Sequence, residues 1–343
     1  MIGKINFRNF LKSKLFTLLI IWIGLLVIFT VWAGIIGVPF LTVDTIVEIG
    51  DLLVLTSFLS VGAGFLMVSG NLDLSASAIG MCASVFMAKA MRYWEFHPML
   101  AILGAIVVAV LLGTFNGMLV NEFKFPPFIA TLAMAGVITG LAQWISVPPG
   151  RVAPGPVQVR NDYTRLLGDG KLFDLIPYTL ILAVIVFVVY GLVLARTKFG
   201  KQVYMVGGNP QAARLSGISP RKMYYLLFAN SGFLAGIAGV IHMGRNSQGS
   251  LNALAANQFT GLTAALLGGI SFGGGSGNLA GVFLGLVVLN TFNKGTTIVR
   301  FSTYWTTAFT GILLLIALTM DHFNLVRAQK QVGLIKPAKE EKH

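Results

Sequence analysis

Long apolar runs alternate with short polar connections over nearly the whole chain. A helix that crosses a bilayer needs about 20 mostly apolar residues, and ten segments approach that requirement. They are 15–37, 52–70, 74–91, 98–120, 128–147, 177–195, 223–243, 258–270, 279–293 and 304–320. The pattern therefore predicts an all-α polytopic membrane protein with about ten transmembrane helices.

The eighth and ninth segments are short for membrane spans, and they flank the glycine-rich stretch 268–278, "GGISFGGGSGN". Non-helical backbone at membrane depth occurs where protein or water covers it, so we expect a broken or re-entrant helix here. Its glycines indicate either places where helices shift or close helix packing. They are Gly268, Gly269, Gly273, Gly274 and Gly275.

A weak internal similarity joins residues 64–80 to residues 265–281. Both stretches run from an apolar segment through small polar residues into another apolar segment. Two related halves are common in transporter folds, so the similarity suggests an internal repeat.

The charges indicate how the chain lies in the membrane. Only 11% of the 343 residues are charged, against about a quarter in soluble domains. Bases gather in residues 1–14, 195–222 and beyond 320, whereas the connection 41–51 holds three acids and no base. Basic residues beside spans mark the cytoplasmic side, and ten spans place these three segments and both termini there. The formal net charge of +13 is thus explained by membrane orientation, without nucleic acid.

The connections are too short for a soluble domain. Each of the longest has fewer than thirty residues, too few to form a hydrophobic core. We expect one transmembrane domain, 1–325, and a basic cytoplasmic tail, 326–343. The first apolar run continues to Phe40 without a cleavage site, so it is interpreted as a retained span and not a signal peptide. Cys82 is the one cysteine, which excludes an intramolecular disulfide.

The sequence lacks the motifs of the common catalytic sites. It contains no phosphate-binding loop, H-E-x-x-H, G-x-S-x-G or Cys/His cluster, so we expect no enzyme activity, cofactor or metal in this chain. Asp73 directly precedes a span, where a carboxylate can cap a helix. No second acid or histidine stands near it to pass a proton, so the cap is favoured over a proton relay.

Residues 204–228, "YMVGGNPQAARLSGISPRKMYYLLF", specify a short separate helix between two spans. Asn209 suits the N-cap, Pro210 the first helical position and Gly217 the left-handed stop. Ser219 and Pro220 then repeat the start signal for the next span. A helix of about two turns is marginal alone, so it needs a surface to pack on. A membrane-surface helix is one interpretation, but Leu215 is its single large apolar residue. Docking into a groove of another protein is favoured.

Several stretches together resemble the transmembrane permease subunits of ABC importers, in the ribose, xylose and galactose group of sugar permeases. The resemblance covers about residues 45–320. Its stretches are "SGNLDLSASAIG" (69–80), "FPPFIATLAM" (125–134), "RTKFGKQVYMVGGNPQAARLSGI" (196–218), "ALLGGISFGGGSGNLAGVFLG" (265–285) and "LLLIALTMD" (313–321). Ser77, where similar permeases often have glycine, and the doubled proline 126–127 depart from the family pattern. These departures weaken any transfer of substrate identity.

The resemblance implies that the short cytoplasmic helix is a coupling helix seated in a cleft of a separate ATP-binding-cassette ATPase, which would hold ATP and Mg. The coupling residues are Asn209, Gln211, Ala212, Ala213, Arg214, Leu215, Ser216 and Gly217. It also implies an extracytoplasmic sugar-binding protein, a second permease copy forming a homodimer, and a location in the bacterial cytoplasmic membrane.

Polar residues in or beside spans are candidates for the translocation pathway, and Phe128 at a helix start is a candidate for either a gate or a packing residue. The set is Asn71, Asp73, Ser75, Asn121, Phe128 and Thr131, with Asn116 and Asn290 as further members. Hydrogen bonding between neighbouring helices is the alternative role for several of them.

The favoured function is the permease subunit of an ATP-driven importer of a pentose or hexose. A nucleoside or a sugar-like signal is the alternative cargo. A self-sufficient ion-coupled carrier and a membrane enzyme are the alternative classes.

Overall fold

The computed structural model describes residues 14–331. The predictions that concern residues 1–13 and 332–343, including the bases of the N-terminal segment and of the end of the tail, lie outside the described residues.

The described chain is almost entirely helical. Its helices are α2 (Lys14–Ile35), α3 (Val43–Val68), α4 (Ala76–Tyr93), α5 (Pro98–Asn121), α6 (Pro127–Ser146), α7 (Asp162–Asp169), α8 (Tyr178–Arg196), α9 (Lys198–Gly208), α10 (Pro210–Leu215), α11 (Pro220–Asn246), α12 (Asn257–Leu267), α13 (Leu279–Ile298) and α14 (Thr303–Gln331). Four strands of two residues, β1 (Val157–Gln158), β2 (Lys171–Leu172), β3 (Ile176–Pro177) and β4 (Gln248–Gly249), form the antiparallel pairs β1–β4 and β2–β3.

Seven of these helices are long and apolar enough to cross a membrane, namely α2, α3, α5, α6, α8, α11 and α13. The all-α polytopic membrane fold is therefore confirmed. Each of the ten predicted segments overlaps a helix, the other three being α4, α12 and α14. That all ten cross the membrane, with both termini in the cytoplasm, stays a prediction. The domain boundary at 325 also stays a prediction, and α14 continues through it to Gln331.

Two local predictions were wrong. The acids of the predicted connection 41–51 lie in helix α3, which begins at Val43 because the Thr42 side chain accepts a hydrogen bond from the Thr45 N–H. The ninth segment is not short, since α13 continues past Asn293 to Ile298. The connection 148–176 contains helix α7, whose N-cap Asn161 accepts the Tyr163 N–H.

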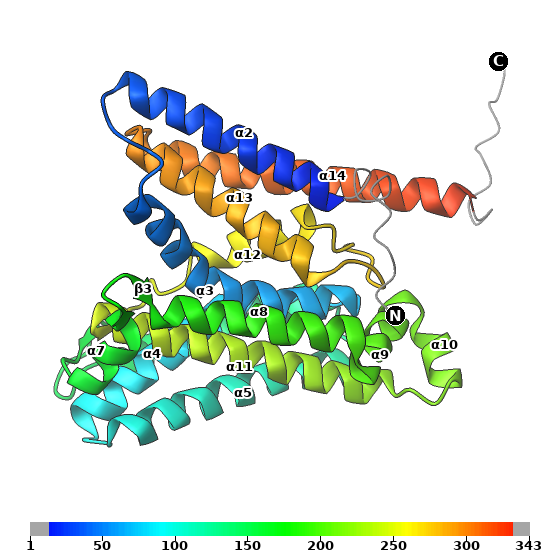
Figure 1. The fold of residues 1–343 in the computed structure, drawn as a ribbon. Helices are drawn as coiled ribbons and strands as arrows, with labels where there is room; N and C mark the ends of the chain where they lie inside the picture. Colours follow the sequence, from blue (N-terminus) through cyan, green and yellow to red (C-terminus); the bar gives the residue numbers. More distant parts are fainter. Residues whose placement is uncertain (1–13, 332–343) are drawn as a thin grey trace, which may run out of the picture.

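The two ends of the bundle differ (Figure 1). Helices α9 and α10 lie at one end, called here the α10 end, together with the start of α2 and the end of α14. Helix α7 and strand β3 lie at the opposite end, called the α7 end. The parts of these base-rich segments that fall within residues 14–331 thus lie at one end of the molecule.

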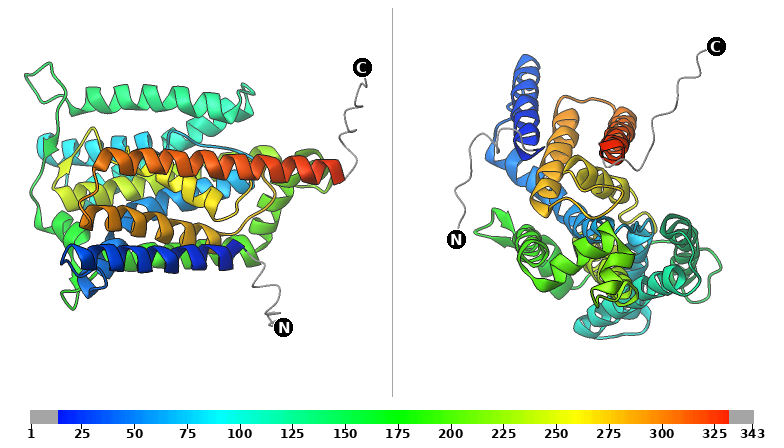
Figure 2. Two further views of the ribbon diagram at one scale, coloured as in Figure 1. Left: turned by 90° about the horizontal axis from the view of Figure 1, so that it is seen from above. Right: turned by 90° about the vertical axis from the view of Figure 1, so that its right-hand side faces the viewer.

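Helix α11 forms the centre of the larger helix group, where it packs against α3, α4 and α5. Glycines allow this close approach: a Cβ at Gly113 or Gly232 would overlap backbone of the facing helix. The right-hand view of Figure 2 looks along the helices and shows α2, α13 and α14 gathered on the side away from α5. Helix α6 lies at the edge of the larger group, against α4 and α5.

Candidate coupling and translocation sites

Helix α10 is capped as the sequence predicts. The Asn209 Oδ1 accepts the backbone N–H groups of Gln211 and Ala212, each at 3.0 Å. Gly217 has φ +80°, the left-handed conformation that ends a helix. The Ser219 Oγ then accepts the N–H of Lys222 at the start of α11. Local sequence therefore sets the two ends of this helix.

One predicted coupling residue faces inward. Ala213 is 1% exposed and packs inside its own chain, so it is not available to a partner in this structure, and its small side chain serves intramolecular packing. The other residues of the predicted set are exposed at the surface. Leu215 is 91% exposed, which makes it the large apolar side chain that α10 offers to a partner. The coupling role of the set stays a prediction.

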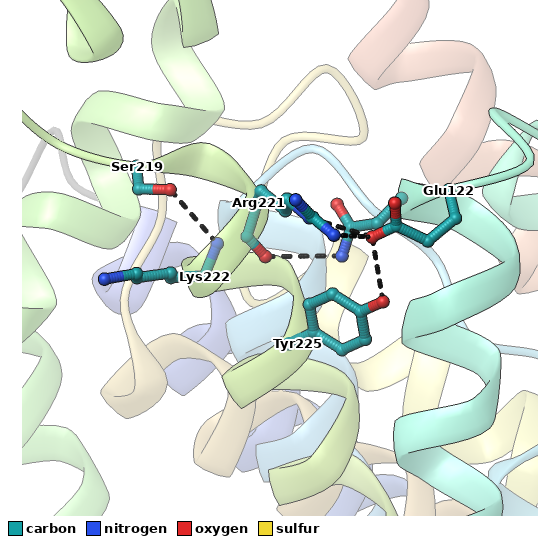
Figure 3. Close-up of polar contacts among 6 residues, drawn as sticks. Glu122, Ser219, Arg221, Lys222 and Tyr225 are labelled. Carbon is teal, nitrogen blue, oxygen red and sulfur yellow. Dashed lines mark hydrogen bonds and ion pairs between the residues drawn. The ribbon is translucent and has the colours of Figure 1, made fainter.

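A polar clamp joins the start of α11 to the end of α5 (Figure 3). Glu122, the residue after α5, accepts hydrogen bonds from the Arg221 Nε at 2.8 Å and the Tyr225 hydroxyl at 2.9 Å. The Arg221 Nη2 lies 2.7 Å from the same carboxylate oxygen. The Asn121 side chain donates to the Arg221 carbonyl oxygen at 3.3 Å. The hydrogen bond from Tyr225, and then those from the Arg221 guanidinium together with its charge, lower the pKa of Glu122.

Sequence reasoning missed this clamp, which consists of Glu122, Arg221 and Tyr225. About a hundred residues separate Glu122 from its two partners, and no local pattern connects them. The cap at Ser219 and the clamp two residues later fix the direction in which the chain leaves α10. The start of α11, which follows α10 directly, is thereby bonded to the end of α5.

The connection 69–75 leads back into the bundle and is held by Asp73. This side chain is 1% exposed. Its Oδ1 accepts the Ser75 N–H at 2.8 Å and the Ser75 hydroxyl at 2.6 Å, and its Oδ2 accepts the Ser231 hydroxyl at 2.9 Å. The predicted N-cap role is wrong in detail: Ser75 occupies the N-cap of α4, and Asp73 binds the N–H of that residue from two positions earlier.

The true side-chain cap of α4 comes from α12. The Gln258 Oε1 accepts the Ser77 N–H at 2.8 Å, while the Gln258 Nε2 donates to the Asp73 carbonyl oxygen at 2.9 Å. The Asn116 side chain donates to the Ser75 hydroxyl at 2.6 Å, and the Leu74 N–H donates to Thr131 at 3.0 Å. The connection 69–75 is therefore tied to α5, α6, α11 and α12.

The predicted pathway residues lie mostly inside the protein. The buried members, with hydrogen bonds inside the chain, are Asn71, Asp73, Ser75, Asn116, Asn121, Thr131 and Asn290. Phe128, 50% exposed on the first turn of α6, is the exception. Interhelical or local bonding thus accounts for the polar members in this structure, and their role in transport stays a prediction.

Two cavities lie on the side of the bundle between α6 and α14. One of about 1170 Å³ is lined by α12, α13, α14 and the 300–302 turn; the other, of about 530 Å³, lies between α4 and α6. Ala255, just before α12, borders both. We call the pair the α6–α14 groove. Ser77 and Thr139 lie in it, next to the buried residues that the sequence favoured.

Comparison with known proteins identifies the family. The sequence model of the permease component of the branched-chain amino acid transport system matches residues 45–318. The ribose import permease of Bacillus subtilis (strain 168) is 30% identical over 268 residues, which cover 78% of this chain and 81% of that protein.

Two further relatives are also sugar permeases. The L-arabinose transport system permease of Escherichia coli (strain K12) is 30% identical over 303 residues, 88% of this chain and 90% of that protein. The fructose import permease of Rhizobium meliloti is 27% identical over 291 residues, 84% and 81% of the two chains. No solved structure matches. The chain therefore belongs to this permease family, in which these relatives are sugar permeases, and it is a multi-pass protein of the inner membrane.

Proposed function

We propose that this chain is the membrane-spanning permease subunit of an ATP-driven importer, and that its cargo is a monosaccharide, a pentose or a hexose. The observation that carries the coupling is helix α10, which is capped at both ends, largely exposed, and followed directly by α11, whose start the clamp joins to the end of α5. The relatives, named for ribose, arabinose and fructose, support the class of cargo.

The driving force would come from a separate ATP-binding-cassette ATPase that holds ATP and Mg. A six-residue helix gains little from its own backbone hydrogen bonds, so α10 requires an outside surface to serve as a rigid contact. Leu215 and Arg214, both exposed, give that contact one apolar anchor and one charge. When the ATPase moves α10, the clamp moves the start of α11 and the end of α5 with it.

The cargo would pass along the α6–α14 groove, which a second copy of the chain closes to form a homodimer. Helix α6 suits this position because it packs only at the edge of the bundle and exposes large apolar side chains such as Ile129, Leu132 and Trp144. A sugar-binding protein would deliver the cargo at the α7 end, opposite the ATPase.

Purification of the tagged protein from its native membranes, followed by mass spectrometry of the proteins that remain bound, tests the coupling. We expect an ATPase with a phosphate-binding loop to be recovered with wild type and lost from Leu215→Glu and Arg214→Glu. The matched control is Arg160→Glu, an exposed charge reversal in the 148–176 connection. An ATPase retained equally by all variants would contradict docking through α10.

Uptake into vesicles separates the classes of transporter. ATP-dependent uptake of ribose, xylose, arabinose or fructose with the ATPase present supports the importer. Uptake by the permease alone under a proton or sodium gradient would instead support a secondary carrier. ATP-driven uptake of a nucleoside or a sugar-like signal, and of none of these sugars, would change the cargo and keep the mechanism.

A further inference from the structure

A third cavity, of about 800 Å³, lies near the α7 end between α3, the end of α11 and the start of α12. Gly168, Asp169, Lys171 and Pro177 also line it. Pockets for small molecules occupy roughly 300–1,000 Å³, so its size suits a small solute. Neither coupling nor the α6–α14 groove uses it. We call it the amide cavity, after the side chains of Asn246, Asn252 and Asn257 in its lining.

The charges around the amide cavity are balanced. The Arg245 Nη2 lies 2.7 Å from the Asp51 Oδ1 and donates to the Thr179 hydroxyl at 2.6 Å. Glu48 forms an ion pair with Lys294. Asp169 and Lys171 supply one further charge of each sign. A charged solute would lose its hydration on entering this cavity, and no unpaired charge of opposite sign would compensate for that loss. The cavity therefore favours a neutral solute.

Polar groups in the lining remain available for a ligand. Asn252 and Asn257 both line the cavity, and their side-chain amides make no hydrogen bond within residues 14–331. Each amide offers both a donor and an acceptor. Alternating donors and acceptors on a neutral surface match the hydroxyl groups of a polyol.

The position of the amide cavity connects it with the groove. Ala255 and Ala256 border both the amide cavity and the cavity of about 1170 Å³. The two cavities are therefore separated at this point by these two residues. Leu254, the preceding residue, has φ +62° and is buried. A solute in the amide cavity therefore lies beside the groove and toward the α7 end.

We propose that the amide cavity is a binding site for the neutral, polyhydroxylated cargo within a single protomer, where the side-chain amides of Asn252 and Asn257 contact its hydroxyl groups before it enters the groove. This inference rests on the proposed sugar-import function and adds to it a location and two contact residues.

The test is direct binding of radiolabelled D-ribose, L-arabinose, D-xylose and D-fructose to the purified full-length permease in nanodiscs. At least one sugar should bind wild type. Asn257→Leu removes both hydrogen-bonding groups at similar size and should weaken that binding about tenfold. Gln158→Leu makes the same kind of exchange on the exposed face of β1, outside the cavity, and should leave binding unchanged.

A second variant guards against misfolding. If Asn257→Leu lowers the unfolding temperature, Asn257→Asp keeps the shape, removes the donor and upsets the charge balance, so it should also weaken binding. Failure of every sugar to bind wild type, or equal binding to wild type and both Asn257 variants, overturns the inference.

ATP-driven uptake by the complete transporter separates this result from the proposed function. If uptake depends on the ATPase and the KM of the Asn257 variants equals that of wild type, the amide cavity is not on the route and the importer stands. If uptake does not depend on an ATPase, the proposed function itself fails.

Discussion

The connection 69–75 between α3 and α4 and the connection 268–278 between α12 and α13 carry similar sequences, yet they are stabilised in different ways. In the first, buried polar side chains accept and donate the hydrogen bonds, with Asp73 at the centre. In the second, glycines bring backbone against backbone: the Gly275 N–H donates to the Val68 carbonyl oxygen at 2.8 Å. A Cβ at Gly274 would lie 2.8 Å from the Gly70 nitrogen.

The two connections also meet each other. Gly207 of α9 lies between them, where a Cβ would overlap the Val68 carbonyl oxygen and approach the Gly275 nitrogen. Gly268, Gly274 and Gly275 thus lie in close contact with other backbone in this structure, which favours packing for these three among the two roles that the sequence left open. The comparison teaches that the connection 69–75 is stabilised by side-chain atoms that donate and accept hydrogen bonds. The connection 268–278 depends instead on the absence of Cβ atoms, which lets backbone pack against backbone.

The largest effect should come from adding atoms at the meeting point. Gly207→Ala forces a methyl group into backbone that has no flexible side chain to yield, so we expect a loss of about 3 kcal/mol or more in the free energy of unfolding. Thermal unfolding in detergent measures it. Gly208→Ala is the matched control, since a Cβ there meets nothing within 4 Å. Equal melting of the two variants would contradict close packing.

The next effect comes from removing atoms in the polar connection. Asp73→Ala leaves the Ser75 N–H and the hydroxyls of Ser75 and Ser231 without their acceptor in a buried site, which should cost about 2–3 kcal/mol. Ser276→Ala in the glycine connection exchanges an exposed side chain and should change stability by less than about 0.5 kcal/mol. Comparable losses in the two melting curves would remove the distinction between the connections.

A smaller effect should follow from the cap that α12 supplies. Gln258→Ala deprives the Ser77 N–H and the Asp73 carbonyl of partners, and loss of a helix cap costs about 1 kcal/mol. Hydrogen exchange should show faster exchange of the Ser77 amide. The Asn209 cap of α10 is surface-exposed, so Asn209→Ala should speed exchange at Gln211 and Ala212 and leave Ser77 unchanged. Unaltered protection of Ser77 in Gln258→Ala would show that the cap does not form.

The smallest effect on stability should come from the clamp, where water competes for the same groups. Because the folded-state pKa of Glu122 lies below its usual value of 4.5, its contribution is fully present above pH 4.5 and is lost as the pH falls through the folded pKa. Glu122→Gln should therefore melt below wild type at pH 7, and the gap should narrow below pH 4.5. Glu95→Gln, an exposed carboxylate after α4, is the control. A gap independent of pH would contradict the assigned role of the charge.

The sequence by itself determined what depends on neighbouring residues. Ten apolar segments overlap ten helices, and the residues Asn209, Gly217 and Ser219 set the ends of α10 and the start of α11 as predicted. The physical reason is that both signals come from residues close together in the sequence. A transmembrane helix is indicated by about twenty consecutive, mostly apolar residues, and a helix cap depends on residues three or four positions apart. The resemblance to the permease family was also found in short stretches of consecutive residues.

Only the tertiary structure decided which distant groups meet. Gln258 caps a helix that begins 182 residues earlier in the chain, Glu122 pairs with Arg221, and Ala213 turns inward although its neighbours are exposed. Polar residues in an apolar segment are compatible with a pathway or with bonding between helices, and only the structure shows that those around Asp73 are buried and hydrogen-bonded inside the chain. The amide cavity has no signal in the sequence, because it exists only where α3, α11 and α12 approach one another in three dimensions.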